Sequence, residues 1–255
     1  MCYATFENHH HNKYAIIKKD HKKRMENSTI SQEAPKVEQY LNNQETFFLK
    51  YKKAIIAAVV AVIVIIAGSI VFKTFYWGPR QDKASTALAK AQDLFANEQF
   101  EKALNGDKGA EGFLAVASNY SGTDAANLAN LYAGLCYANL GKWQEAVKYL
   151  DDFSAQDDAM ISPAALAALG NAYAHTNQID KAVSALKDAA SKADSEAEDG
   201  VNNSISPTAL IQAARLLESQ NKKDEALKIY QTVKEKYVNS PASMDVDKYI
   251  ERLSK

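Results

Sequence analysis

The chain has 255 residues and a formal net charge of −1, with 47% hydrophobic and 24% charged residues, which is enough for one or two domains. The charges are distributed unevenly along the chain. Residues 1–53 carry ten basic and six acidic side chains, residues 54–72 carry none, and residues 73–255 carry twenty basic and twenty-five acidic. The acidic balance of the C-terminal part argues against a phosphate-binding surface, so we expect no nucleic-acid partner.

The first segment, residues 1–46, is polar and has no sustained apolar period, which predicts a largely disordered tail or at most a short helix. The run His9–His11 could bind a metal, but we interpret it as part of a solvated tail. Met25 opens a stretch that is typical of a protein start. We therefore interpret residues 1–24 as an upstream extension, which mass spectrometry of the native N-terminus would test.

Residues 54–72, AIIAAVVAVIVIIAGSIVF, are nineteen residues without a charge. A helix of that length spans about 28 Å, close to the hydrocarbon thickness of a bilayer. Aromatic residues, which favour membrane interfaces, flank the run at Phe47, Phe48, Tyr51, Phe75, Tyr76 and Trp77. We predict one uncleaved transmembrane helix over residues 47–77. A buried globular helix is disfavoured because every face is apolar. A cleaved signal peptide is disfavoured because the run is long and lies far from Met1.

The basic residues around the apolar run predict its orientation. Lys50, Lys52 and Lys53 abut the N-terminal end and more lysines lie upstream, whereas Lys73 and Arg80 follow the other end. Because cytoplasmic flanks are enriched in Lys and Arg, we expect residues 1–46 in the cytoplasm and residues 78–255 across the membrane.

A helical pattern recurs after the apolar run. Residues 131–150, LYAGLCYANLGKWQEAVKYL, align with residues 167–186 at an offset of 36, a third copy follows 44 residues later, and a weaker copy precedes them. Small residues twelve positions apart let the two helices of a pair approach closely, with aromatic residues beside them. The predicted packing positions are Ala91, Ala103, Gly134, Tyr137, Ala146, Gly170, Tyr173, Ala182, Ala214 and Ala226.

The turns and starts of the helices follow the same register. Gly141, Asn177 and Asn221 occupy equivalent turn positions, where Gly and Asn tolerate the left-handed conformation that ends a helix. The Ser-Pro pairs at 162–163, 206–207 and 240–241 are predicted helix starts, with Ser as N-cap and Pro at the first helical position. Asp124 is the predicted cap before residue 125.

Three segments depart from the repeat. Residues 104–124 are interpreted as an insertion plus a helix at 111–120 that completes the first pair. Residues 192–206 form an acidic loop or helix extension, and residues 243–253 form a closing helix with a polar outer face. Helix–turn–helix units with a period near 34 resemble the tetratricopeptide repeat over about residues 84–240. This resemblance implies an all-α solenoid after an N-terminal transmembrane helix.

The whole layout resembles the YfgM-like family of ancillary SecYEG translocon subunits. The resemblance is carried by KYKKAIIAAVVAVIVIIAGSIVFK, by NLANLYAGLCYANLGKWQEAVKYL and by the ending KIYQTVKEKYVNSPASMDVDKYIERL. It implies a single-pass bacterial inner-membrane protein with a periplasmic domain, contacting translocon subunits, periplasmic chaperones or exported chains. The partner assignment is an analogy.

The sequence shows no motif for catalysis, cofactor binding or metal binding. The sequence has no phosphate-binding Gly-rich loop and no nucleophile motif, and Cys2 and Cys136 show no metal spacing. We interpret Cys136 as a buried apolar residue, His175 as a solvated turn residue, and the acidic pairs at 151–152 and 157–158 as solvated charge. We therefore expect no enzyme, cofactor, metal or small-molecule substrate.

A protein partner is expected on the first helices of the stacked pairs. The outward positions three residues before and one residue after the small residue predict contacts at Leu131, Leu135, Asn171, Ile211 and Arg215, with Ala167 beside them. Such a groove would be mainly apolar and would suit an amphipathic helix or an unfolded apolar segment. The alternative is that Leu131 and Leu135 pack on the first repeat.

Three hypotheses follow. The first is a non-enzymatic, membrane-anchored interaction protein that assists secretion or folding outside the inner membrane. The second is a structural scaffold of another cell-envelope or division complex. The third is an accessory subunit of an enzyme complex, or a cryptic hydrolase.

Overall fold

The computed structural model describes residues 50–254. The predictions for the tail at 1–46, for a start at Met25, for His9–His11 and for Phe47 and Phe48 lie outside these residues. The chain divides into two units that meet along the sequence between Phe72 and Lys73. The described residues of both units form helices and turns, and no strand occurs among them.

The first unit contributes a helix over residues 50–72, almost all of it exposed. Within the described part of the chain, the helical run Lys50–Ala96 holds the stretch that is long and apolar enough to cross a membrane, with a mean hydropathy of 3.2 and none of that stretch buried. Side chains such as Ile63 and Ile65 are 58% and 67% exposed. A helix this apolar and this uncovered is a candidate for insertion into a bilayer.

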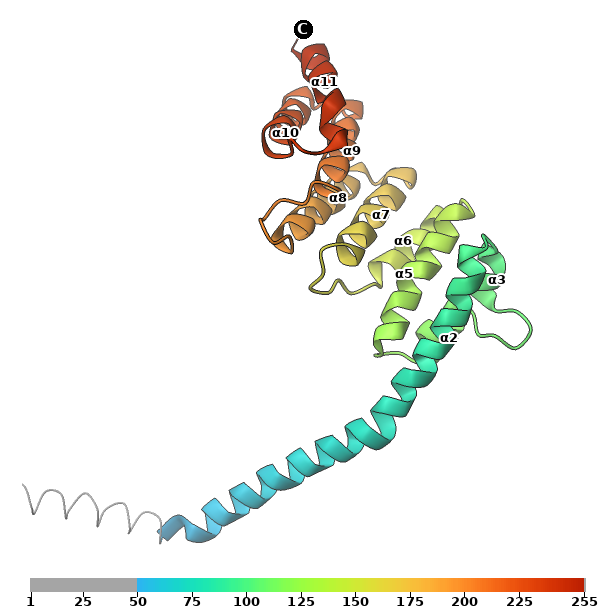
Figure 1. Cartoon of the computed structure of the whole chain (residues 1–255), viewed down its shortest axis with the longest axis vertical. Helices are drawn as coiled ribbons and strands as arrows, with labels where there is room; N and C mark the ends of the chain where they lie inside the picture. Colours follow the sequence, from blue (N-terminus) through green and yellow to red (C-terminus); the bar gives the residue numbers. More distant parts are fainter. Residues whose placement is uncertain (1–49, 255) are drawn as a thin grey trace, which may run out of the picture. The chain divides into compact units, whose positions relative to one another are not determined.

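The second unit is a succession of paired helices, which Figure 1 shows stacked one after another from α2 to α11. The prediction of an all-α tetratricopeptide-type solenoid is confirmed. Its elements are the π-helix η1 (Lys73–Trp77), α2 (Gly78–Ala96), α3 (Phe100–Asn105), α4 (Phe113–Asn119), α5 (Asp124–Asn139), α6 (Trp143–Asp151), α7 (Ile161–His175), α8 (Ile179–Ser195), α9 (Ser206–Ser219), α10 (Lys223–Lys236), the 3₁₀-helix η2 (Pro241–Asp245) and α11 (Val246–Leu253).

Three apolar clusters form the core of this unit. One joins α2 to α5, one joins α5 and α6 to α7, and the largest runs from α8 to α11. Each cluster contains residues of more than one pair; Leu186 of α8, for example, lies with Tyr230 and Val233 of α10, all three 0% exposed. A pair of helices buries its apolar face on its neighbours, which is the physical reason for the sequence repeat.

The turn predictions are confirmed, and a fourth turn joins them. Gly141, Asn177 and Asn221 have φ of 72°, 60° and 61°, and Glu98, seven residues after the small position of the first pair, has φ of 58°. In all four turns the left-handed residue donates to the carbonyl three residues before it. The following residue donates to the carbonyl five before it, and these N···O distances are 2.8–3.0 Å. The first pair thus makes the same turn with a residue poorly suited to it.

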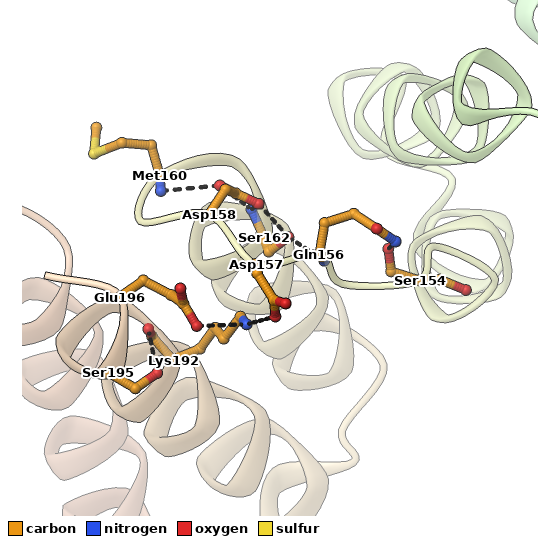
Figure 2. A network of polar contacts seen from close by, with 9 residues as sticks. All are labelled: Ser154, Gln156, Asp157, Asp158, Met160, Ser162, Lys192, Ser195 and Glu196. Atoms are coloured by element: carbon orange, nitrogen blue, oxygen red, sulfur yellow. Dashed lines mark hydrogen bonds and ion pairs between the residues drawn. The ribbon is translucent and has the colours of Figure 1, made fainter.

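The start of α7 differs from the prediction that Ser162 is its N-cap. Asp158 lies before the helix, and its Oδ1 accepts the backbone N–H groups of Met160, Ile161 and Ser162. The Ser162 hydroxyl instead donates to Asp158 and accepts the backbone N–H of Gln156 at 2.7 Å, as Figure 2 shows. The carboxylate caps the helix because it reaches several amides at once.

The start of α9 repeats this arrangement, so Ser206 is also not the N-cap. The side-chain oxygen of Asn202 accepts the backbone N–H groups of Ser204 and Ile205 at 3.0 and 2.9 Å. Asn202 lies 44 residues after Asp158, the same offset that relates the two helix pairs. The repeat register therefore carried the signal for both caps, because Asp and Asn are capping residues at an equivalent position.

Of the other two predicted caps, one was wrong and one is confirmed. At α5 the cap is Thr123, whose hydroxyl accepts the N–H of Ala126 at 3.1 Å. Asp124 is the first helical residue, so the cap and the helix start lie one residue earlier than predicted. Ser240 is confirmed as the cap of η2, where its hydroxyl accepts the N–H of Ala242 at 3.2 Å.

The departures from the repeat are resolved as follows. In the first pair a loop separates α3 from α4, and Gly106 and Gly112 cross so closely that a Cβ on Gly112 would lie 2.4 Å from the Gly106 nitrogen. A helix within 111–120 is confirmed as α4. Residues 192–206 combine both expected forms, since α8 extends to Ser195 and a loop follows. The closing segment is η2 followed by α11.

Candidate functional site

The predicted small positions lie where two helices of a pair meet. A Cβ added to Gly134 would lie 2.5 Å from Leu150 Cγ, and one added to Gly170 would lie 2.7 Å from Leu186 Cγ. Both distances are shorter than van der Waals contact, so a leucine of the second helix occupies the space above each glycine. These contacts fix the spacing of α5 against α6 and of α7 against α8.

The remaining packing positions are buried or partly buried. The alanines with 0% exposure are Ala91, Ala103, Ala146, Ala182, Ala214 and Ala226. Tyr137 and Tyr173 are half-buried. Tyr137 stacks on Tyr149 with ring centroids 5.4 Å apart, and the Tyr173 hydroxyl donates to Asp151 at 3.3 Å. These rings fill the edges of the pairs.

The five predicted partner contacts do not share one surface. Leu131 and Ile211 are 7% and 8% exposed and belong to apolar clusters of the domain itself. Leu135 is half-buried against the cluster that contains Leu131. Asn171 and Arg215 are exposed. Neighbouring pairs in the stack cover Leu131 and Ile211, the positions before the small residue in the second and fourth pairs.

Arg215 is engaged within the chain. Its guanidinium lies 5.2 Å from the ring centroid of Tyr249 on α11 and donates to the hydroxyl of that residue. Tyr249 stacks on Tyr230 of α10 with centroids 5.1 Å apart. Arg252 of α11 donates to both carboxylate oxygens of Glu218, at 2.8 and 2.7 Å. The closing helix therefore packs on the last pair and contacts Arg215, which was predicted to bind a partner and remains exposed.

Asp194, near the end of α8, is a buried polar residue with four hydrogen-bond donors around it, and the sequence did not predict this role. Its Oδ1 accepts the N–H of Asn202 at 2.8 Å and the hydroxyl of Ser206 at 2.7 Å. Its Oδ2 accepts Lys236 Nζ and the Tyr237 hydroxyl, each at 2.6 Å. Burial acts to raise the pKa of this carboxyl, but these four donors stabilise the carboxylate and hold the pKa below its ordinary value.

This carboxylate joins four parts of the domain: the end of α8, the following loop, the start of α9 and the end of α10. The partners of Asp194 lie 8 to 43 residues away in sequence. No local pattern marks them. The acidic segment at 192–206 was predicted only as a loop or extension, because the contacts exist only once the last pair is stacked.

A second polar group near this place is more exposed, and Figure 2 shows it. Lys192 Nζ lies 3.1 Å from Asp157 and 2.9 Å from Glu196, and the Asp157 side chain is 96% exposed. Water screens an ion pair that is exposed to this extent, so the pair stabilises the fold little. It links the loop before α7 to α8 without anchoring it as Asp194 does.

His175 and Cys136 have structural surroundings. The imidazole of His175, the last residue of α7, stacks on the Trp143 indole with centroids 3.7 Å apart and planes 2° from parallel. His175 is exposed but is not merely solvated, because it forms a ring contact between two pairs. Cys136 is 0% exposed, as predicted, and burial raises the pKa of its thiol to about 12.

One hollow of the domain, of about 290 Å³, lies beside the start of α5 and is lined by groups that hydrogen-bond within the fold. There the Asn127 amide donates to the Ser154 carbonyl at 2.8 Å and accepts the Ser154 N–H at 2.7 Å, and Asn130 donates to the Asp152 carbonyl. Within residues 50–254, no group of three His, Cys, Asp or Glu side chains is placed to hold a metal ion.

Comparison with known proteins agrees with this architecture. The tetratricopeptide repeat family matches residues 128–157 and 208–240. A kinesin light chain-like protein of Podosopora anserina with nearly identical TPR-like repeats is similar in structure, with a TM-score of 0.50 and 15% identity over 68% of this chain and 86% of the other. A point variant of that protein gives the same score and identity, with 85% of it covered. No curated protein matches in sequence.

The chain therefore contains tetratricopeptide repeats, and 15% identity to the solved structures shows the fold alone. This fold is typically a non-enzymatic scaffold that binds proteins, so protein partners are the class of ligand that the repeats imply.

Proposed function

We propose that this protein is a membrane-anchored interaction module whose tetratricopeptide domain works outside the bacterial inner membrane as an accessory factor of the secretory translocon or of the periplasmic chaperone network. It acts by binding proteins and carries out no catalysis. The apolar helix at 50–72 anchors the chain, with the N-terminus in the cytoplasm.

The observation that carries the proposal is the combination of the two units in one chain. The apolar helix has no buried face and a mean hydropathy of 3.2, which suits a bilayer. The repeats supply a protein-binding scaffold. Lys50, Lys52 and Lys53 at one end of the helix support the cytoplasmic N-terminus. Tethering raises the effective concentration of the domain near membrane partners.

Topology is tested with reporter enzymes fused after Lys255. Alkaline phosphatase, which is active only outside the cytoplasm, should be active in this fusion, and a cytoplasmic reporter at the same place should be inactive. The reverse result would place the domain in the cytoplasm and overturn the role in secretion. Replacing Lys50, Lys52 and Lys53 by Gln is the companion variant, because it removes the charges on which the orientation rests.

The partner is tested by photo-cross-linking in intact cells. A photoreactive amino acid at Asn171, which is exposed on α7, should capture translocon subunits or periplasmic chaperones. The matched control is the same amino acid at Lys187, which is exposed on the second helix of the same pair. Capture of division or envelope machinery at Asn171 would instead support the scaffold hypothesis and contradict the proposal.

A further inference from the structure

The last junction of the stack differs in chemistry from the inner ones. Between α5 and α7 the contact is made by apolar side chains, with Leu131, Ala165 and Leu169 at its centre. Between the last pair and α11, apolar residues of α11 join the core cluster, and an aromatic stack and ion pairs add to the contact. Val246 and Tyr249 are the buried residues of α11.

The ion pairs of α11 have short distances, but their side chains are exposed to solvent. The Arg252 and Asp247 side chains are 56% and 72% exposed, and Asp247 pairs with Lys234 at 2.7 Å. Ion pairs of this exposure contribute little to stability and weaken with salt. A helix of eight residues is not stable alone in water, so α11 exists as a helix only while it is docked. Undocking of α11 therefore also unfolds it.

The face of α9 beneath α11 carries a carboxylate and a guanidinium that both need hydrogen-bonding partners. Glu218 is 18% exposed in its side chain and also accepts the Tyr230 hydroxyl at 2.6 Å. A carboxylate held this way needs a cation above it. Arg215 beside it offers its guanidinium to a ring and a hydroxyl. In α11 these needs are met by Tyr249 and, three residues later on the same helix face, by Arg252.

We propose that the face of α9 and α10 under α11 is a binding groove for an amphipathic helix of a partner protein that carries Tyr and, three residues later, Arg. The closing helix occupies this groove in the free protein and competes with the partner. This inference rests on the proposed function as a protein-binding module, and it names the ligand of one part of the surface.

The test uses the full chain in detergent micelles and a fluorescent peptide of residues 241–254. Wild-type chain should bind the peptide weakly, because its own α11 fills the groove. Arg252→Glu loosens the cis helix, and this chain should bind the wild-type peptide at least about tenfold more tightly. The matched control is Lys187→Glu, a basic-to-acidic change at an exposed residue of α8. It should behave as wild type.

The recognition pair is tested by exchange of charge. Glu218→Arg in the chain should lose the wild-type peptide and bind a peptide carrying Arg252→Glu. Circular dichroism melts establish whether each variant folds. If a variant does not fold, its binding measurement is replaced by hydrogen exchange of α11 in the wild-type chain, with and without peptide. Peptide should speed that exchange.

The following results overturn the inference. In the first, the Arg252→Glu chain binds the peptide no more tightly than the wild type. In the second, a scrambled peptide binds equally well. In the third, light scattering shows a dimer that exchanges α11, which assigns the groove to a second copy. None of these touches the reporter and cross-linking results, so failure here is distinguishable from failure of the proposed function.

Discussion

The second and third pairs of the solenoid are held by a glycine under a leucine, whereas the fourth pair is anchored by a buried carboxylate. Gly170 leaves a Cβ-sized space that Leu186 fills, and the contact is apolar and local to one pair. Asp194 accepts four hydrogen bonds from three separate segments. The comparison shows that one repeat architecture uses packing where the period is regular and a polar anchor where a loop of extra residues interrupts it.

The largest effect is expected from Asp194→Ala. The change leaves Lys236, Tyr237 and Ser206 without their shared acceptor in a site where the carboxylate was 12% exposed. Removing one partner of such a buried network costs about 3–5 kcal/mol. Thermal unfolding of the full chain in micelles, followed by circular dichroism, should show this loss. Glu198→Ala, an exposed acidic residue on the same segment, should change stability by less than about 0.5 kcal/mol.

Breaking the apolar contact should cost less. Gly170→Val places methyl groups where Leu186 Cγ lies, so the two helices of the third pair must move apart. Overpacking of this kind costs about 1–3 kcal/mol. The adjacent exposed change Asn171→Val, measured in the same melts, controls for the β-branched side chain in α7. Equal effects of the two variants would contradict the packing role of the glycine.

Acid should act on the polar anchor and not on the apolar contact. The pKa of Asp194 is lowered in the folded state, so its contribution is complete above the ordinary value of 3.8 and is lost as the pH falls through the folded value. Melting temperature should therefore fall when the pH is lowered from about 5 to about 3. The drop should be smaller in Asp194→Asn. The Gly170→Val chain should keep the wild-type pH dependence.

The smallest effect concerns the first pair and should be stabilising. Glu98 holds φ of 58°, where its counterparts are Gly and Asn. A side chain in this conformation costs about 1–2 kcal/mol, which glycine avoids. Glu98→Gly should raise the stability of the domain by up to about 1 kcal/mol in denaturant titrations. Asn97→Gly, at φ of −90°, is the control and should destabilise.

The sequence reasoning succeeded where a few neighbouring residues carry the information. Gly141, Asn177 and Asn221 were predictable because a left-handed residue is needed to end a helix and few types tolerate it. It failed at Ser162 and Ser206, because Ser before Pro is a common cap. In the structure the residue four places earlier, Asp158 or Asn202, instead accepts backbone N–H groups at the start of the helix. Those two caps were within reach of the repeat register.

The partner surface could not be predicted fully because the sequence did not show which side chains are buried in the stack. The positions of Leu131 and Ile211 on their helices were read from the repeat, but their exposure depends on neighbouring helices of the stack. Arg215 was placed on the surface, and its contact with Tyr249, 34 residues later, follows only from how the closing helix docks. Helix periodicity predicts which residues share a face of a helix. Whether that face is buried depends on the neighbouring helices of the stack.

By itself the sequence determined the apolar helix, the paired helices, their left-handed turns and the period that makes them stack, because hydrophobic spacing and turn chemistry act over a few residues. Only the tertiary structure decided that Asp194 would anchor the fourth pair, that Leu131 and Ile211 would be core, and that α11 would contact Arg215. Those outcomes depend on groups tens of residues apart, whose meeting is fixed by packing between pairs and not by any local preference.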